Sequence, residues 1–244
     1  MMELRPGQTV TNTDLSLMDF TDLDLTEAVF LDCAFTETQF SNTVFEAAQF
    51  KGCRLIRCRF AHADLREASF EDCVLSESQK GAEFAFGRME AVRFARCDLS
   101  FAKFDRVDLY GASFDACNLR GAMFLKADFG KAFGRSVVRW AGSFKACSLE
   151  LADLAELILP SGEFTGCGLR EADLRDANLE GCDLRGTDLF QALTTGAKLA
   201  RADLRGAEIS GLDLSKLASF ADAKIAADQQ HRLLTAMGLD VLPD

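Results

Sequence analysis

The stretch ADLRDANLEGCDLRGTDL, residues 172–189, decides the fold. A leucine recurs in it every five residues, and the residue two positions before each leucine is small. A five-residue period fits neither an α-helix, which has 3.6 residues per turn, nor the alternation of a simple strand. Residues two apart in extended backbone point to the same side, so the small residue and the leucine both face inward. Each unit therefore predicts one short extended face followed by a corner.

The same pattern runs through almost the whole chain. Large apolar residues keep the five-residue spacing over 15–75, 84–129 and 144–214, and again at Phe220 and Ile225 after a slip of one residue. Units such as ADLRE at 63–67 resemble the A(D/N)LXX motif of the pentapeptide repeat family. The resemblance extends over roughly residues 13 to 225 of the 244 in the chain.

The resemblance implies an all-β fold: a right-handed quadrilateral β-helix in which four five-residue faces make one coil of twenty. Residues 13–225 then form about ten coils, and a strand spacing of about 4.8 Å gives a rod of about 50 Å. Residues 1–12 are predicted as an N-terminal cap, and 226–244 as a C-terminal helix and strand. Phenylalanine supports the coil length by recurring at twenty residues in two series: Phe20, Phe40, Phe60, and Phe84, Phe104, Phe124, Phe144, Phe164.

The period shifts once between Leu75 and Phe84. A four-residue insertion explains the shift. A one-residue deletion also would, but it would place Lys80 or its neighbours inside, and burying an unpaired ammonium costs several kcal/mol. We therefore expect a loop that leaves the rod near 76–83.

A second stretch, 130–143, is irregular. The regular register would bury Gly134 and Arg139 on an apolar axis, which excludes that register for these residues. We expect Phe133 and Val138 to turn inward instead. The polar or amphipathic residues of the stretch are then expected near the surface: Arg135, Arg139 and Trp140.

All nine cysteines occupy the small inward position of the repeat: Cys33, Cys53, Cys58, Cys73, Cys97, Cys117, Cys147, Cys167 and Cys182. A free cysteine behaves as a small buried hydrophobe, which is what this position needs. Stacked strands hold neighbouring Cβ atoms near 4.8 Å, just beyond the usual disulfide range of roughly 3.5–4.5 Å. We expect free structural thiols, no metal or redox site, and a reducing cytoplasm.

Several function classes are excluded by the composition. A net charge of −11 argues against direct nucleic-acid binding, and no apolar run approaches a membrane span. We find no signal peptide. His62 and His231 are isolated, and the chain has no phosphate loop, HExxH or CxxC motif. We expect neither an enzyme nor a cofactor.

The tail after the repeat predicts a short helix over Gln229–Met237, with Asp228 as its N-cap and Gly238 at its end. A solenoid needs such an element because its last coil exposes both core and strand edge. The ending QHRLLTAMGLDV is similar to the tail of the quinolone-resistance branch of the family, Qnr and MfpA. That resemblance implies a homodimer formed by the tail through Leu233, Leu234, Met237, Leu239 and Val241.

The charge is uneven, at −8 over residues 1–79, +5 over 80–149 and −8 over 150–244. Resemblance to the Qnr branch implies a DNA-mimicking protein that binds DNA gyrase or topoisomerase IV and protects it from quinolones or related poisons. It implies a partner-binding loop at Ser76, Glu77, Ser78, Gln79, Lys80 and Gly81. It also implies an acidic partner surface in the last third, at Asp173, Asp176, Asp183, Asp188 and Asp203.

A second interpretation stays open. Most proteins that carry this repeat have no assigned role, so the chain can equally be a structural or adaptor module that binds another protein. The loop at 76–83 and the tail favour the topoisomerase interpretation, because a purely structural rod needs neither.

Overall fold

Each five-residue unit builds one face and one corner. The large residue is buried, and the Asp or Asn before it accepts a backbone N–H two residues further on, as Asp173 Oδ1 does from Arg175 at 3.1 Å. This Asx turn closes the corner. The corner residue takes left-handed backbone, with φ of 59° at Asp176 and 68° at Gly181. The acidic and glycine positions of the motif are therefore explained by local geometry.

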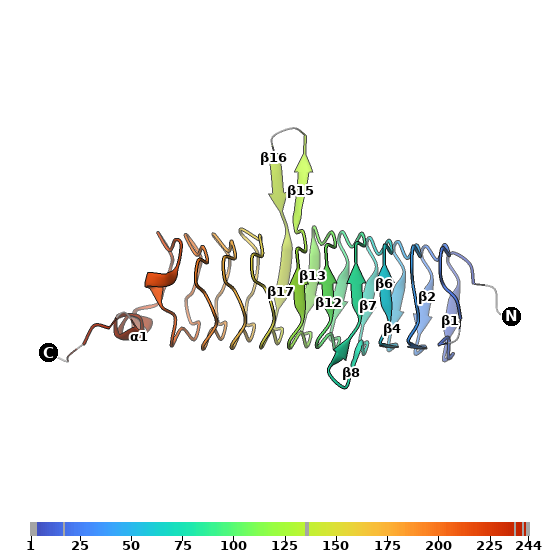
Figure 1. Ribbon diagram of the computed structural model, residues 1–244, viewed down its shortest axis with the longest axis horizontal. Helices are drawn as coiled ribbons and strands as arrows, with labels where there is room; N and C mark the ends of the chain where they lie inside the picture. Colours follow the sequence, from blue (N-terminus) through green and yellow to red (C-terminus); the bar gives the residue numbers. More distant parts are fainter. Residues whose placement is uncertain (1–3, 17, 135–136, 237, 241, 243–244) are drawn as a thin grey trace.

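The computed structural model describes residues 4–16, 18–134, 137–236, 238–240 and 242. The chain winds into a rod of stacked coils, with two hairpins standing out on opposite sides and a short helix at the C-terminal end (Figure 1). Seven strands form the longest sheet: β1 (Thr9–Thr11), β2 (Val29–Leu31), β4 (Gln49–Lys51), β7 (Ser69–Glu71), β11 (Arg93–Ala95), β13 (Ala112–Asp115) and β17 (Gly142–Lys145). Four form another: β6 (Arg59–Ala61), β10 (Glu83–Ala85), β12 (Lys103–Asp105) and β14 (Met123–Leu125). The pair β3 (Ala34–Thr36) and β5 (Arg54–Ile56) lies on a further face.

Adjacent coils pair in parallel at a spacing of twenty residues, as Val10 does with Phe30. Pairing thus begins at Thr9, inside the segment 1–12 that the sequence predicts as a cap. The coil count also differs from the expected ten, because the seven strands of the longest sheet are joined by only six turns of the solenoid. Beyond Lys145 the chain pairs through isolated bridges, such as that between Asp183 and Asp203, and its described residues form no further regular strands.

The coil spacing breaks in two places. Ser69 pairs with Arg93, so the intervening coil has four extra residues, and these form the hairpin of β8 (Ser76–Glu77) and β9 (Lys80–Gly81). Ser113 pairs with Ser143, so a later coil has ten extra residues. These make a second hairpin from β15 (Gly130–Phe133) and β16 (Val137–Trp140).

Phenylalanine rings fill the axis in two parallel columns. Neighbouring rings lie 4.6–5.2 Å apart in the first column, which contains Phe30, Phe50, Phe70, Phe94, Phe114, Phe144 and Phe164. They lie 4.6–5.1 Å apart in the second, which contains Phe40, Phe60, Phe84, Phe104 and Phe124. The predicted series that ran from Phe124 to Phe144 is therefore wrong. The ten extra residues move Phe144 under Phe114, and it meets Phe124 edge to face.

The rod ends in two 3₁₀ turns, η1 (Leu214–Lys216) and η2 (Ala227–Gln229), and one helix, α1 (Gln230–Ala236). The helix begins one residue later than predicted, and the turn before it is capped at Ala226 and not at Asp228. The sequence places Phe220 and Ile225 among the inward-facing residues, but their side chains are 45% and 38% exposed. No further coil covers them, because the last bridge of the described chain joins Asp203 to Lys224.

Candidate functional site

The first hairpin turns through Ser78 and Gln79, which both have left-handed backbone with φ of 53° and 62°. A two-residue turn with this geometry matches the twist of the strands that it joins. Of the six residues predicted as a partner-binding loop, Ser76 is buried and Gly81 is partly buried. Glu77 is exposed but held by Arg54 at 3.5 Å. The tip that can reach a partner is therefore Ser78–Gln79–Lys80.

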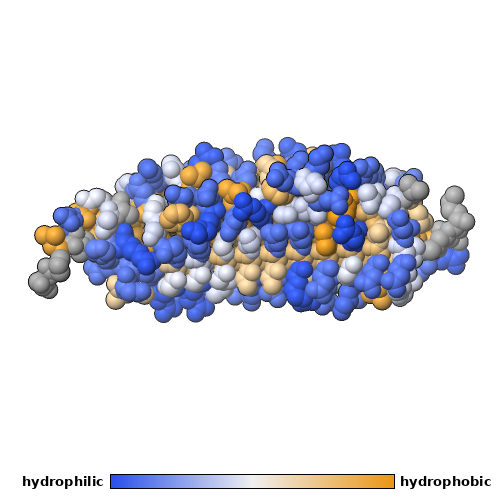
Figure 2. Space-filling model, turned by 90° about the horizontal axis from the view of Figure 1, so that it is seen from below, coloured by the Kyte–Doolittle hydropathy of each residue, from blue (hydrophilic) through white to orange (hydrophobic). Residues whose placement is uncertain are grey.

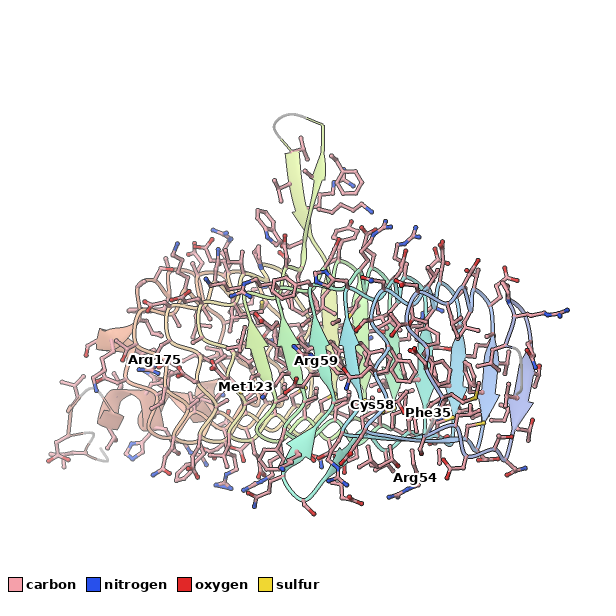
Figure 3. The ribbon with its side chains drawn as sticks, turned by 45° about the vertical axis from the view of Figure 1, so that its right-hand side comes forward. Phe35, Arg54, Cys58, Arg59, Met123 and Arg175 are labelled. Carbon is pink, nitrogen blue, oxygen red and sulfur yellow. The ribbon has the colours of Figure 1, made fainter. Side chains whose placement is uncertain are left out.

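A groove of about 470 Å³ lies between this hairpin and the four-stranded sheet. Its charged lining consists of four cations and one carboxylate: Arg57, Arg59, Lys80, Lys103 and Glu83. Glu83 pairs with Lys103 at 3.0 Å and lies 3.8 Å from Arg59. Figure 3 shows Arg59 and Met123 on the same face of the rod. The foot of the first hairpin is thus cationic, unlike the acidic average of the chain.

The second hairpin corrects the prediction for 130–143. Phe133 and Val138 do not turn inward; each is roughly 45% exposed, at 44% and 47%. They face solvent because the ten extra residues leave the rod as an antiparallel pair, with Lys131 opposite Arg139. Arg139 and Trp140 are exposed, as predicted, whereas Arg135 lies outside the described residues. The hairpin is a finger of apolar and cationic side chains.

The five aspartates of the predicted acidic surface do not form one surface. Three faces of the coil carry them. Asp183 and Asp203 pair on one face, Asp173 pairs with Asp153 on a second, and Asp188 pairs with Glu208 on a third. Asp176 is at a corner.

Most of these carboxylates are also neutralised within their own repeat. The arginine two residues after each aspartate folds back on it, with Nε–Oδ1 distances of 2.9 Å at Asp173, 2.8 Å at Asp183 and 2.8 Å at Asp203. Arg205 lowers the pKa of Asp203 to about 2. Figure 2 shows one side of the rod, mostly hydrophilic, with a band of moderately hydrophobic residues along its length.

The predicted dimer residues are divided by the fold. Leu233 is buried against the last coil and lines a small apolar pocket with Phe220 and Ile225, so it caps its own chain. Leu234 is partly buried and Leu239 is exposed, while Met237 and Val241 lie outside the described residues.

Sequence reasoning missed Gln229, which holds the cap in place. Its amide nitrogen donates to the carbonyls of Leu204 and Ala207, both at 2.8 Å, and its oxygen accepts the N–H of Ala226 at 2.7 Å. The Ala207 carbonyl would otherwise lack the partner that a further coil supplies elsewhere, whereas the Leu204 carbonyl also accepts the N–H of Ala207 at 3.0 Å. The only sequence signal was a polar residue just before an apolar helix face.

Comparison with known families accounts for most of the rod. The profile described as "Pentapeptide repeat region" matches residues 9–79, and "Pentapeptide repeats (8 copies)" matches residues 88–132, 147–186 and 182–216. The chain belongs to the pentapeptide repeat family. No curated protein sequence gives a significant match to it.

Among solved structures, this pentapeptide repeat protein is similar to QnrB1, described as a plasmid-mediated fluoroquinolone resistance protein. One trypsin-treated variant of QnrB1 is 22% identical with a TM-score of 0.68, over 96% of this chain and 98% of that one. A second is 21% identical with a TM-score of 0.62, over 97% and 99%. Full-length QnrB1 is 20% identical with a TM-score of 0.61, over 95% and 100%. At these identities the likeness shows a shared fold along the whole chain.

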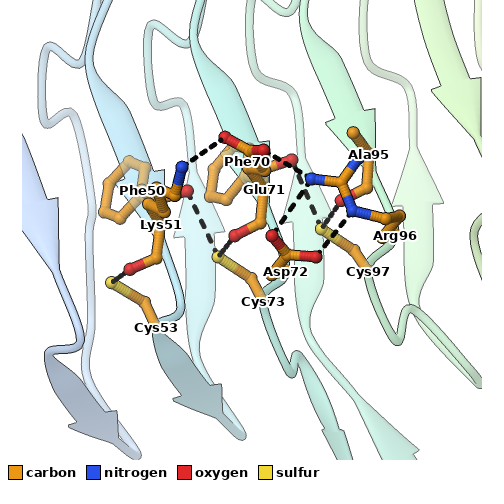
Figure 4. A network of polar contacts seen from close by, with 10 residues as sticks. All are labelled: Phe50, Lys51, Cys53, Phe70, Glu71, Asp72, Cys73, Ala95, Arg96 and Cys97. Atoms are coloured by element: carbon orange, nitrogen blue, oxygen red, sulfur yellow. Dashed lines mark hydrogen bonds and ion pairs between the residues drawn. The ribbon is translucent and has the colours of Figure 1, made fainter.

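The nine thiols of the repeat are all free and buried. Seven of them form one column that continues past both insertions: Cys33, Cys53, Cys73, Cys97, Cys117, Cys147 and Cys167. Each thiol in it donates to a backbone carbonyl, as Cys53 does to Phe30 at 3.3 Å and Cys73 to Phe50 at 3.3 Å. Figure 4 shows three of these thiols beneath an outer ion-pair network in which Arg96 meets Asp72 at 2.7 Å. Burial raises the pKa of Cys58 to about 12, so that thiol stays protonated and unreactive.

The described part of the chain brings no group of three or more His, Cys, Asp or Glu residues together to hold a metal ion. His62 stacks on Phe86 at 5.2 Å, and His231 is exposed on α1. Among the described residues no helix has the length and apolar character to cross a bilayer. Among the described residues of this pentapeptide repeat protein, the features that depart from the regular rod are the two hairpins, the cationic groove and the exposed apolar side chains Phe220, Ile225 and Leu239 near the C-terminal end.

Proposed function

We propose that this protein binds a type II topoisomerase, DNA gyrase or topoisomerase IV, in the cytoplasm and protects it from quinolones or related poisons. The observation that carries the proposal is the pair of hairpins that interrupt an otherwise continuous rod. The axis is filled with phenylalanine and leucine and leaves no room for a substrate. We infer action by binding alone, without catalysis, cofactor, small-molecule substrate or direct contact with nucleic acid.

The second hairpin supports a protein partner most directly. It holds four apolar side chains in solvent within eight residues: Phe133, Val137, Val138 and Trp140. Exposed apolar clusters of this kind mark interaction sites on soluble proteins. Arg139 lies 5.4 Å from the Phe133 ring, so a cation accompanies the apolar surface. Aromatic residues and arginine are the side chains that most often dominate binding energy.

DNA mimicry is the finer part of the proposal and is local. A dimer of two rods of about 50 Å with −11 each has one net charge per about 4.5 Å, against one per about 1.7 Å in duplex DNA. Within the described residues Glu156 and Asp176 make no ion pair, and their coils are adjacent because Asp153 pairs with Asp173. The mimicry would rest on such unpaired carboxylates, since Arg175, Arg185 and Arg205 neutralise their neighbours.

We further propose that the tail forms a homodimer, because Phe220, Ile225 and Leu239 are left uncovered at the rod end. Leu239→Asp should give a monomer in light scattering, since it places a charge in the interface without touching the Leu233 cap. Leu151→Asp, at an exposed leucine on the side of the rod, is the matched control and should leave the dimer intact. A monomeric wild-type protein at high concentration would refute this part of the proposal.

Gyrase supercoiling with and without ciprofloxacin tests the function. Protein at micromolar concentration should restore supercoiling in the presence of the drug, because a bound protector lowers the population of the poisoned complex. The proposal is refuted if the protein neither protects nor inhibits gyrase and has neither effect on topoisomerase IV.

The alternative is an adaptor that binds another protein through the same hairpins. The arginine pairing at Asp173, Asp183 and Asp203 favours it, since few carboxylates then imitate phosphates. Binding of an unrelated partner with no effect on either topoisomerase would select the adaptor.

A further inference from the structure

The foot of the second hairpin is attached to the rod by side chains as well as by the chain itself. Lys131 on β15 makes a short ion pair with Glu90, two coils earlier, and its ammonium lies 5.6 Å from the centre of the Tyr110 ring. Tyr110 in turn meets Phe133 edge to face at 5.9 Å. Gly130 N donates to Asp128 Oδ1 at 2.7 Å. One lysine therefore joins the hairpin to two successive coils.

Glu90 lies near a second partly buried carboxylate, Asp108, and both are near the exposed Asp128. Asp108 follows Arg88 and precedes Asp128 in one bridged row, so Asp108 has Arg88 and Glu90 on the coil before it and Asp128 on the coil after it. Burial, Glu90 and Asp128 raise the pKa of Asp108 to about 6. Lys131 lowers the pKa of Glu90, and Glu90 raises that of Lys131. The charged groups around Asp108 are thus Arg88, Glu90, Asp128 and Lys131, and the backbone N–H of Tyr110 donates to Asp108 Oδ1 at 3.1 Å.

We propose that Lys131 and Glu90 form a latch that positions the second hairpin on the rod, and that the charge of Asp108 sets how tightly the latch holds. The partner-binding role of the hairpin rests on the proposed function, whereas the latch itself does not. Lys131, Glu90 and Asp108 are positioning residues, since each acts through the placement of the exposed apolar finger.

The charge of Asp108 acts in a definite direction. When Asp108 is ionised, Lys131 faces two neighbouring carboxylates, and the attraction that holds the hairpin foot is strongest. When Asp108 is protonated, its hydroxyl donates to Glu90 and competes with Lys131 for that carboxylate, while one negative charge is lost. The latch should therefore tighten as the pH rises through about 6 and loosen below it.

The chain contains its own probe of this contact. Tyr110 is the only tyrosine and lies on the rod; Trp140 is the only tryptophan and lies in the hairpin. Trp140 pairs with Gly130 at the foot of the hairpin, so energy transfer from Tyr110 to Trp140 reports how that foot sits on the rod, in the unmodified protein and without a partner.

The test is a pH titration of this transfer between about pH 5 and about pH 7.5. The wild-type protein should show a change with a midpoint near 6, with higher transfer above it. Asp108→Asn should remove the midpoint, and Lys131→Gln should lower the transfer at every pH. Lys131→Arg should restore most of the transfer, because it keeps the positive charge. Lys198→Gln removes an exposed cation from a later coil, away from Trp140, and should behave as wild type.

Two results would overturn the latch: a midpoint near 6 that survives in Asp108→Asn, or unchanged transfer in Lys131→Gln. The wild-type titration needs no variant. Even if a substitution unfolds the protein, energy transfer in the wild-type protein that does not change between about pH 5 and about pH 7.5 would refute the latch. The supercoiling assay is read separately. If the energy-transfer tests support the latch but gyrase is not protected in the supercoiling assay, the proposed function is refuted and the latch is not.

Discussion

Removal of the second hairpin should leave the rod folded and abolish protection of the topoisomerase. Deleting residues 131–140 joins Gly130 to Ala141 and takes out ten residues, so that Ala112 and Gly142 pair again at the normal spacing of twenty. The apolar finger is lost while every buried column keeps its neighbours. We expect the concentration needed for protection to rise at least about tenfold, equivalent to about 1.4 kcal/mol of binding.

Circular dichroism and thermal melting establish whether the deleted protein is folded, and supercoiling with ciprofloxacin measures its function. The matched comparison is Leu151→Ser, which removes an exposed apolar side chain away from both hairpins and should protect as wild type does. Deleting Gln79–Ala82 tests the first hairpin in the same way, since it removes the four extra residues there. Full protection by the folded 131–140 deletion would exclude the hairpin from partner binding.

Phe104→Ala should be among the most destabilising single substitutions in the rod, at about 3–5 kcal/mol of unfolding free energy. Phe104 is fully buried and stacks on Phe84 at 5.1 Å and Phe124 at 4.7 Å. Truncation removes both stacking contacts and leaves a cavity that the neighbouring coils cannot close, because their backbone spacing is set by the pairing of strands. The measurement is urea unfolding followed by circular dichroism, with the m-value compared to wild type.

Phe86→Ala is the control for the same chemical change on the outside. Phe86 is 47% exposed and lies against His62 and Arg106 on the surface of the rod. Its truncation should cost under about 1 kcal/mol. Equal costs at Phe86 and Phe104 would contradict the assignment of the two phenylalanine columns as the core.

The inward face of each repeat could be predicted from residue type alone. Leu174 and Cys182 are buried as expected, since the alternation of extended backbone decides which side chains point inward. The first hairpin was equally visible, because four extra residues shift the phase of a five-residue period. The prediction of a single acidic surface was wrong for a different reason. Residues at the same position of the five-residue repeat, such as Asp173 and Asp183, lie on different faces of the coil.

The second hairpin shows what the sequence could not determine. Ten extra residues are two whole repeats, so Phe124 and Phe144 stay in phase although they lie in different columns. The sequence by itself determined the repeat, the inward residues and the buried thiols, because these follow from backbone geometry within five residues. Only the tertiary structure decided which coils stack, where the finger leaves the rod, and that Lys131 meets Glu90. Those contacts depend on pairing between coils. The ten extra residues keep the five-residue phase on either side of them, so the irregular stretch shows that the local register fails but not which coils pair across it.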